Sequence, residues 1–219
     1  MARFFRDNGL TIVLMLLFLG SIIGQWLAGW HFENETLAEH GEQAITLGQF
    51  TTDPQFLSTV FENWESEFLQ MAAFVVLTAC LYQKGSAESE DPDEPPRDKN
   101  LAAQARKRGA PKILRQGTAA RWVYAHSLGI VLSILFVATF ALHWWFSAKH
   151  AAEEAAMHGQ AAQSALDYLT SAQLWFESFQ NWQSEFLSTA VLIVLSIYLR
   201  QAESPESKPV AAPHSQTGT

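Results

Sequence analysis

The sequence has few of the residues from which soluble catalytic and metal sites are built. Its 219 residues include a single cysteine, Cys80, which excludes a disulfide framework and a Cys-x-x-Cys metal knuckle. It also has no phosphate-binding loop, no Gly-x-Gly-x-x-Gly turn, no His-Glu-x-x-His pair and no nucleophile–base motif. We therefore expect a protein that is not an enzyme and that requires no cofactor.

Positive charge is scarce and unevenly placed. The chain has 14 Lys and Arg residues against 22 Asp and Glu residues, which gives a formal net charge of −8. No basic residue lies between Arg6 and Lys84, and Lys149 is the only one between Arg121 and Arg200. Because the balance is acidic and the basic residues form short stretches, we expect no nucleic-acid partner.

The two long gaps between basic residues contain four apolar runs, at residues 10–30, 68–82, 128–146 and 186–199. A membrane-spanning helix needs about 20 mostly apolar residues. The first and third runs reach this length unaided, and the second and fourth reach it only with the residues before them. The first run is too long for a cleaved signal peptide, so we interpret it as a helix of the mature protein. The sequence thus predicts an all-α membrane protein with four transmembrane helices.

The basic residues also predict the orientation of these helices. Thirteen of the 14 precede the first run, lie between the second and third, or follow the fourth; Lys149 is the exception. Because cytoplasmic loops carry an excess of Lys and Arg, we expect a multi-pass inner-membrane protein with both termini in the cytoplasm. The two acidic hairpin loops then face the outside.

The two halves of the chain align without a gap when they are shifted by 118 residues. FENWESEFL at residues 61–69 falls on FQNWQSEFL at residues 179–187, and His40-Gly41 falls on His158-Gly159. This match indicates two parallel two-helix repeats related by a pseudo-two-fold axis along the membrane normal. The predicted parts are repeat 1 (residues 1–83), a polar cytoplasmic connector (84–120), repeat 2 (121–200) and a disordered cytoplasmic tail (201–219).

A ridge of small residues follows one face of the first apolar run. Gly20, Gly24 and Ala28 are spaced four residues apart, which allows another helix to approach closely. The corresponding positions of the second repeat hold larger residues at Leu142 and Phe146. We favour packing within the chain over dimerisation for this ridge.

A polar stripe precedes the second and fourth apolar runs. Its members share one helical face and recur in both repeats: Asn63, Ser66 and Glu67 in the first, and Asn181, Ser184 and Glu185 in the second. A carboxylate at the membrane edge must be paired, protonated or hydrated. We favour a structural role for the stripe, and the alternative is a proton or cation site at which Glu67 and Glu185 meet near the pseudo-axis.

Most of the tryptophans lie toward the predicted outer side. Trp26, Trp64, Trp144 and Trp182 are placed where indole rings anchor helices at the membrane interface. His40 and His158 share the repeat and lie among acidic residues, which makes them the one weak candidate for an outer metal site. Because their spacing matches no zinc motif, we interpret them as turn residues and expect no metal.

The duplicated NWxSEFL motif, together with the short apolar span and GSAESEDP that follow its first copy, resembles a bacterial family of small membrane proteins catalogued as a domain of unknown function. The resemblance implies an all-helical inner-membrane protein and supplies neither an activity nor site residues. Our leading hypothesis is a non-enzymatic scaffold or accessory protein, and the alternative is a small proton or cation transporter or channel. The expected partners are the lipid bilayer and either a second copy of the chain or another membrane protein.

Overall fold

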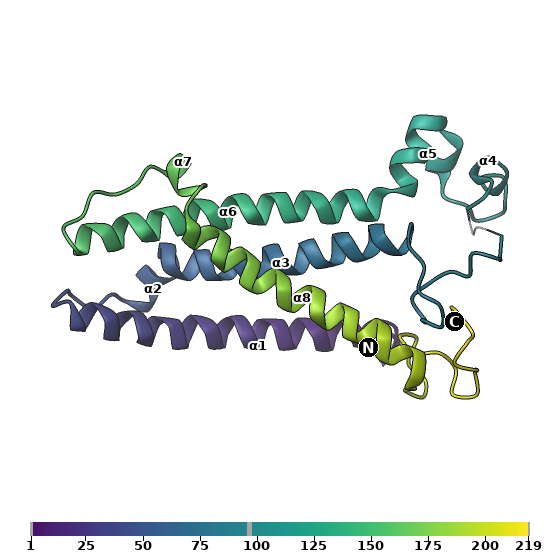
Figure 1. Cartoon of the computed structure of the whole chain (residues 1–219), viewed down its shortest axis with the longest axis horizontal. Coiled ribbons are helices and arrows are strands. Elements are labelled where there is room, and N and C mark those ends of the chain that lie inside the picture. Colours follow the sequence, from purple (N-terminus) through teal and green to yellow (C-terminus); the bar gives the residue numbers. More distant parts are fainter. Residues whose placement is uncertain (1, 96–97, 219) are drawn as a thin grey trace. The chain divides into compact units, whose positions relative to one another are not determined.

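The computed structural model of the chain describes residues 2–95 and 98–218, and in these residues every regular element is a helix. The predicted all-α fold is therefore confirmed at this level. Arg97, one of the basic residues of the connector, lies outside the described residues. The helices follow one another along the chain as α1 Ala2–Glu39, α2 Leu47–Phe50, α3 Pro54–Thr78, α4 Leu101–Gln104, a 3-10 helix Lys112–Arg115, α5 Thr118–Ala125, α6 Ser127–Met157, α7 Ala165–Tyr168 and α8 Ala172–Tyr198 (Figure 1).

Several helix boundaries recur at the spacing of the sequence repeat. Helices α2 and α7 begin and end 118 residues apart, α3 and α8 begin 118 residues apart, and α1 and α6 end 118 residues apart. Both short helices begin with the same cap, because Thr46 accepts a hydrogen bond from the backbone of Gln49 and Ser164 accepts one from that of Asp167. The two halves thus use the same local signals to begin these helices.

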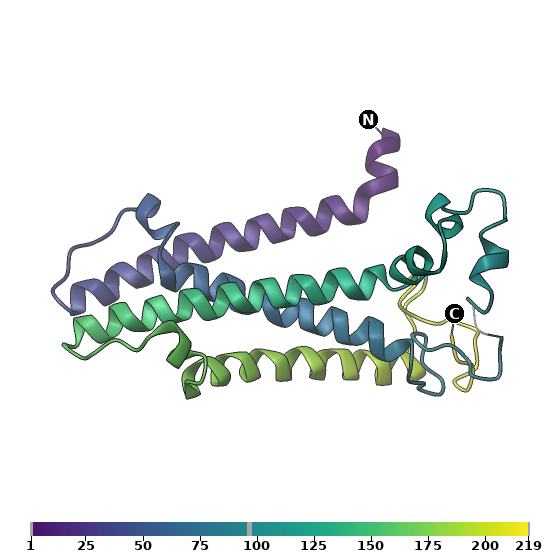
Figure 2. The same cartoon turned by 90° about the horizontal axis from the view of Figure 1, so that it is seen from above.

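Two helices, α1 and α6, are long and apolar enough to cross a membrane, whereas the sequence predicted four such spans. Both run without a break over more than 30 residues (Figures 1 and 2). In α3 and α8 the apolar run and the polar segment before it form one continuous helix. The carboxylates and amides of that segment lower the mean hydropathy of α3 and α8. This explains why these two helices are less apolar than α1 and α6.

The chain divides into two compact units, of which the first comprises Met1–Phe61 and Leu142–Ser171. Here the loop after α1 is fixed to the helix by polar bonds: the Trp30 indole donates to the Ile45 carbonyl at 2.7 Å, and the Asn34 side chain bonds both backbone groups of Ile45. Phe50 is 1% exposed and its ring lies 5.2 Å from that of Phe56. These contacts give the first unit a small core of its own.

The second unit comprises Glu62–Ala141 and Ala172–Thr219. An aromatic cluster joins α6 and α8 in this unit, and its members are Phe136, Phe140, Trp175, Phe179 and Trp182. Ring centroids within the cluster lie 5.4–6.2 Å apart, the separation at which edge-to-face aromatic pairs are favourable.

The C-terminal segment was predicted to be disordered, but residues 201–218 form turns with specific bonds inside the second unit. The Lys208 side chain is 1% exposed and donates to the carbonyls of Pro213, His214 and Gln216. The Gly218 N–H bonds the Ser86 carbonyl at 2.9 Å, which ties the tail to the start of the connector. We name this contact between residues 82–89 and 201–218 the tail clasp.

Candidate functional site

Polar side chains of α3 and α8 bond one another in the second unit. The bonds share one feature, a sequence separation of 117–119 residues, which is close to the repeat spacing of 118. They are Asn181 Nδ2 to Glu62 Oε1 (2.5 Å), Trp182 Nε1 to Glu65 Oε1 (3.0 Å) and Gln70 Nε2 to Thr189 Oγ1 (2.6 Å). Each residue therefore lies opposite, or within one position of, its own counterpart in the other half. We name this site the polar crossing.

Glu65 is the most deeply placed group of the polar crossing. The residue is fully buried, and the next residue, Ser66, is 2% exposed. A buried carboxylate is costly unless donors compensate for the lost hydration, and the Trp182 indole N–H is such a donor. The Trp182 ring is fixed in turn by the aromatic cluster, with its centroid 5.4 Å from that of Phe179. Burial and bonding together make this pair a structural contact between the helices.

The two serines of the predicted stripe form hydrogen bonds within their own helices. Ser66 and Ser184 each donate to the carbonyl three residues earlier, that of Asn63 at 2.9 Å and that of Asn181 at 2.8 Å. These two hydroxyls therefore satisfy their own helices.

The two glutamates of the stripe differ in exposure. Glu67 is exposed and Glu185 is half-buried, and they lie close enough for their charges to interact. A shared proton or cation site at Glu67 and Glu185 therefore stays a prediction.

Sequence reasoning missed Glu62 and Glu65 as members of the site. The sequence prediction favoured polar residues that recur in both halves, and the counterparts of Glu62 and Glu65 are Gln180 and Gln183. Their spacing of three residues was the available signal, because it places both on one side of α3.

A groove of about 400 Å³ continues from the polar crossing between α3 and α8. Gln70 and Thr189 line one part, Phe74, Leu77 and Ile193 line its apolar walls, and Glu88 lies among the lining residues contributed by the connector. Apolar side chains contribute most of the groove's surface, and polar side chains such as Thr78 and Gln83 lie among them.

The first unit gathers charged residues beyond the apolar runs of α1 and α6. Glu33, which is 8% exposed, lies near enough to Asp53, His150 and Glu153 for their charges to interact. No group of three or more His, Cys, Asp or Glu residues with a metal-binding arrangement occurs in residues 2–95 and 98–218.

The predicted packing and anchor residues have several environments. The Trp144 indole donates to the Ala165 carbonyl at 2.7 Å, and Trp26 and Trp64 are half-buried. A Cβ built on Gly20 or Gly24 meets no atom of the described residues within 4 Å, and Ala28 is exposed. Within the first unit, Gly20 and Gly24 therefore have free space beside them, whereas Ala28 lines a cavity together with Phe50 and Phe56.

Comparison with known families gives one match. The profile of the family described as Domain of unknown function (DUF6766) matches residues 1–219. The chain belongs to this family. The predicted resemblance to a family of unknown function is thus confirmed over the whole chain, and the match carries no activity with it. No curated protein and no solved structure matches the chain significantly.

Proposed function

We propose that the chain is a non-enzymatic scaffold or accessory protein of the bacterial inner membrane, crossing it four times with both termini in the cytoplasm. The observation that carries this proposal is the use of polar groups at the polar crossing. Fully buried Glu65 is bonded to Trp182 and Glu62 is bonded to Asn181, so these groups join helices. Because these polar groups fix the two helices to each other, the protein can present a constant surface to a second copy or to another membrane protein.

The membrane location is supported by apolar side chains that are exposed on α1 and α6. Leu10 is 77% exposed, Leu16 is 64% exposed and Val137 is 62% exposed. Apolar surface of this extent is unfavourable in water and is covered without cost by lipid.

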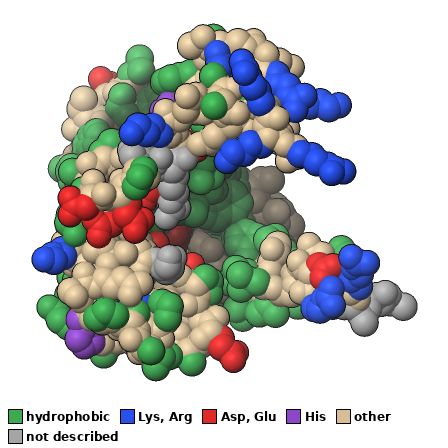
Figure 3. All heavy atoms as spheres, turned by 90° about the vertical axis from the view of Figure 1, so that its right-hand side faces the viewer, with side chains coloured by type: hydrophobic (Ala, Val, Ile, Leu, Met, Phe, Trp, Pro, Cys, Tyr) green, Lys and Arg blue, Asp and Glu red, His purple; other side chains and the backbone are tan. Residues whose placement is uncertain are grey.

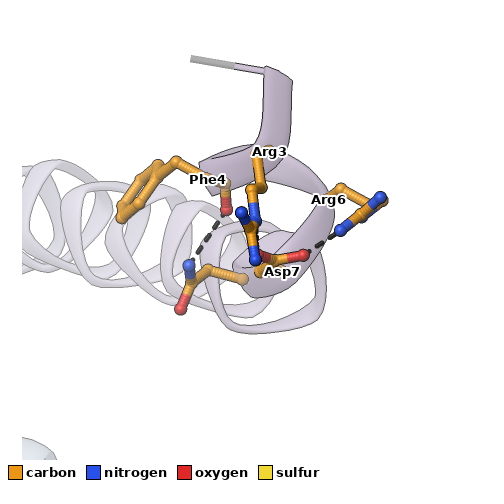
Figure 4. A network of polar contacts seen from close by, with 5 residues as sticks. Arg3, Phe4, Arg6 and Asp7 are labelled. Carbon is orange, nitrogen blue, oxygen red and sulfur yellow. Dashed lines mark hydrogen bonds and ion pairs between the residues drawn. The ribbon is translucent and has the colours of Figure 1, made fainter.

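The orientation is supported by the basic residues at the predicted inner side. Arg3 and Arg6, which precede the apolar run of α1, both pair with Asp7, at 3.5 and 3.1 Å (Figure 4). These pairs are largely solvated and contribute at most about 1 kcal/mol each, so the arginines remain available to anionic headgroups. Lys and Arg side chains also gather on the part of the molecule that carries α4 and α5 (Figure 3).

Four spans and an internal duplication are supported by the recurring helix boundaries. If α3 and α8 cross with α1 and α6, their polar crossing lies at the outer edge of the hydrocarbon. There the hydrogen bonds between the helices compensate for the polar segment that lowers their hydropathy.

Reporter fusions test this topology. Four spans place residue 45 outside and residue 110 in the cytoplasm, so a periplasm-active reporter should work only at residue 45 and a cytoplasm-active reporter only at residue 110. If α1 and α6 alone cross, residue 110 lies outside, and the same pair of fusions would contradict the four-span proposal.

A second candidate function is a small proton or cation transporter or channel, which is favoured by the interacting charges of Glu67 and Glu185. In liposomes, flux should then be measurable and should vanish in the double variant Glu67→Gln, Glu185→Gln while the fold is kept. Absence of flux from the wild-type protein, together with stoichiometric co-purification of a membrane partner, supports the scaffold instead.

A further inference from the structure

Two histidines that are equivalent by sequence meet at one end of the first unit. His40 directly follows α1 and His158 directly follows α6, and their ring centroids lie 5.4 Å apart with the planes at 76°. Each histidine is followed by a glycine with positive φ, +75° at Gly41 and +65° at Gly159. Both imidazoles are thus held on the same kind of helix-ending turn.

The hydrogen bonds of the two rings define which nitrogen carries the proton. His40 Nδ1 lies 2.8 Å from the Thr36 carbonyl, and His158 Nδ1 lies 2.8 Å from the Glu154 carbonyl. A carbonyl oxygen only accepts, so Nδ1 is the donor in both rings. In the neutral imidazole, Nε2 then keeps its lone pair, and both residues are exposed to solvent.

This is the arrangement that metal-binding histidines adopt. A ligating imidazole almost always donates its second ring N–H to a carbonyl or carboxylate, which fixes the tautomer and the ring orientation. The surroundings also favour a cation, because residues 31–53 and 147–171 contain eight carboxylates and one basic residue, Lys149.

We propose that the Nε2 atoms of His40 and His158 form a two-histidine site for a divalent transition-metal ion such as Cu²⁺, Ni²⁺ or Zn²⁺. Imidazole nitrogen selects these ions over Mg²⁺ and Ca²⁺, which prefer oxygen ligands. The described residues supply no third ligand of a metal cluster, so water completes the coordination and the ion exchanges readily. Such a site binds metal without closing around it, unlike the four-ligand zinc sites that stabilise folds.

The test uses the full-length protein without a polyhistidine tag, stripped with chelator and titrated with Cu²⁺ or Ni²⁺ in detergent at pH 7.5. We expect one ion per chain by calorimetry and two equivalent imidazole nitrogens in the Cu²⁺ electron paramagnetic resonance spectrum. His40→Gln and His158→Gln should each weaken binding at least about tenfold, because either variant leaves a single imidazole. Excess Mg²⁺ should not compete.

His126→Gln is the matched control. His126 is also exposed, and its Nδ1 lies 2.7 Å from the Trp122 carbonyl, so it has the same tautomer but is paired with an aromatic ring and not with a second histidine. This variant should bind metal as the wild type does. Wild-type affinity in His40→Gln or His158→Gln, half an ion per chain, or one nitrogen in the spectrum would each overturn the proposal. Circular dichroism and gel filtration show whether each variant keeps its fold, and since both histidines are exposed we expect that it does.

Discussion

The Trp182 indole N–H donates at 3.0 Å to the carboxylate of Glu65, a residue with no exposed surface. The two residues lie 117 positions apart, one residue short of the repeat spacing. This bond connects the polar side of α3 to the aromatic cluster of α8, and the first prediction depends on it.

Trp182→Phe should destabilise the protein by about 1–3 kcal/mol, because it keeps an aromatic ring but removes the indole donor from a buried carboxylate. Thermal unfolding in detergent measures the effect. Trp122→Phe is the matched control, since Trp122 is 57% exposed, and it should leave the midpoint unchanged. A second measurement isolates the bond: Glu65→Gln should be better tolerated in the Trp182→Phe background than in the wild type. Equal midpoints for both tryptophan variants would contradict the structural role of the pair.

Gly29→Ala should destabilise the first unit, although alanine is the better helix former. A Cβ at Gly29 would lie 2.9 Å from Cζ of Phe50, closer than van der Waals contact allows, and the buried Phe50 ring would have to shift to accommodate it. Overpacking of this kind costs about 1–3 kcal/mol.

The control for Gly29 lies on the same helix. A Cβ at Gly24 meets nothing within 4 Å in the described residues, so Gly24→Ala should leave the melting temperature unchanged or raise it. A decrease for Gly24 equal to that for Gly29 would refute the proposed close contact with Phe50.

The tail clasp should loosen as the pH rises. Burial, and after it the neighbouring carboxylate of Glu206, raises the pKa of Glu88 above its ordinary value of 4.5. The clasped state therefore binds this proton more tightly than the released state. The clasp is favoured below the ordinary pKa, and that advantage is lost as the pH rises through the raised pKa.

Hydrogen-exchange protection factors for residues 201–218, corrected for intrinsic rates, measure this effect. Protection should be higher near pH 5 than at pH 8 in the wild type, and Glu88→Gln should remove the difference. Glu203→Gln, which changes an exposed glutamate of the same segment, should retain it. Protection that is independent of pH in the wild type would exclude a role for Glu88.

The sequence predicted the helical elements well where its signals were local. The apolar runs at residues 10–30 and 128–146 anticipated α1 and α6, because a helix of this kind depends on neighbouring residues. The short helices α2 and α7, with their caps Thr46 and Ser164, were not predicted. The sequence also predicted that the polar NWxSEF segments are helical and lengthen the second and fourth apolar runs, as in α3 and α8. It did not anticipate the bonding partners of these segments, which lie more than 100 residues away along the chain.

The bonded carboxylates of the polar crossing were not predicted. Repetition drew attention to Glu67 and Glu185 instead, whose charges interact, and a shared site there stays a prediction. Glu62 and Glu65 were passed over because their counterparts are glutamines. The tail clasp was missed because its composition is typical of disordered segments, whereas the carbonyls around Lys208 come from turns that leave no compositional signal.

The hydrogen bonds of the polar crossing join Glu62 to Asn181 and Glu65 to Trp182, so each carboxylate of α3 meets a neutral donor of α8. The aligned positions of α8 hold Gln180 and Gln183 in place of these two glutamates. The two halves therefore contribute unequal chemistry, with acceptors on one helix and donors on the other, and exchanging the halves would not preserve these two bonds.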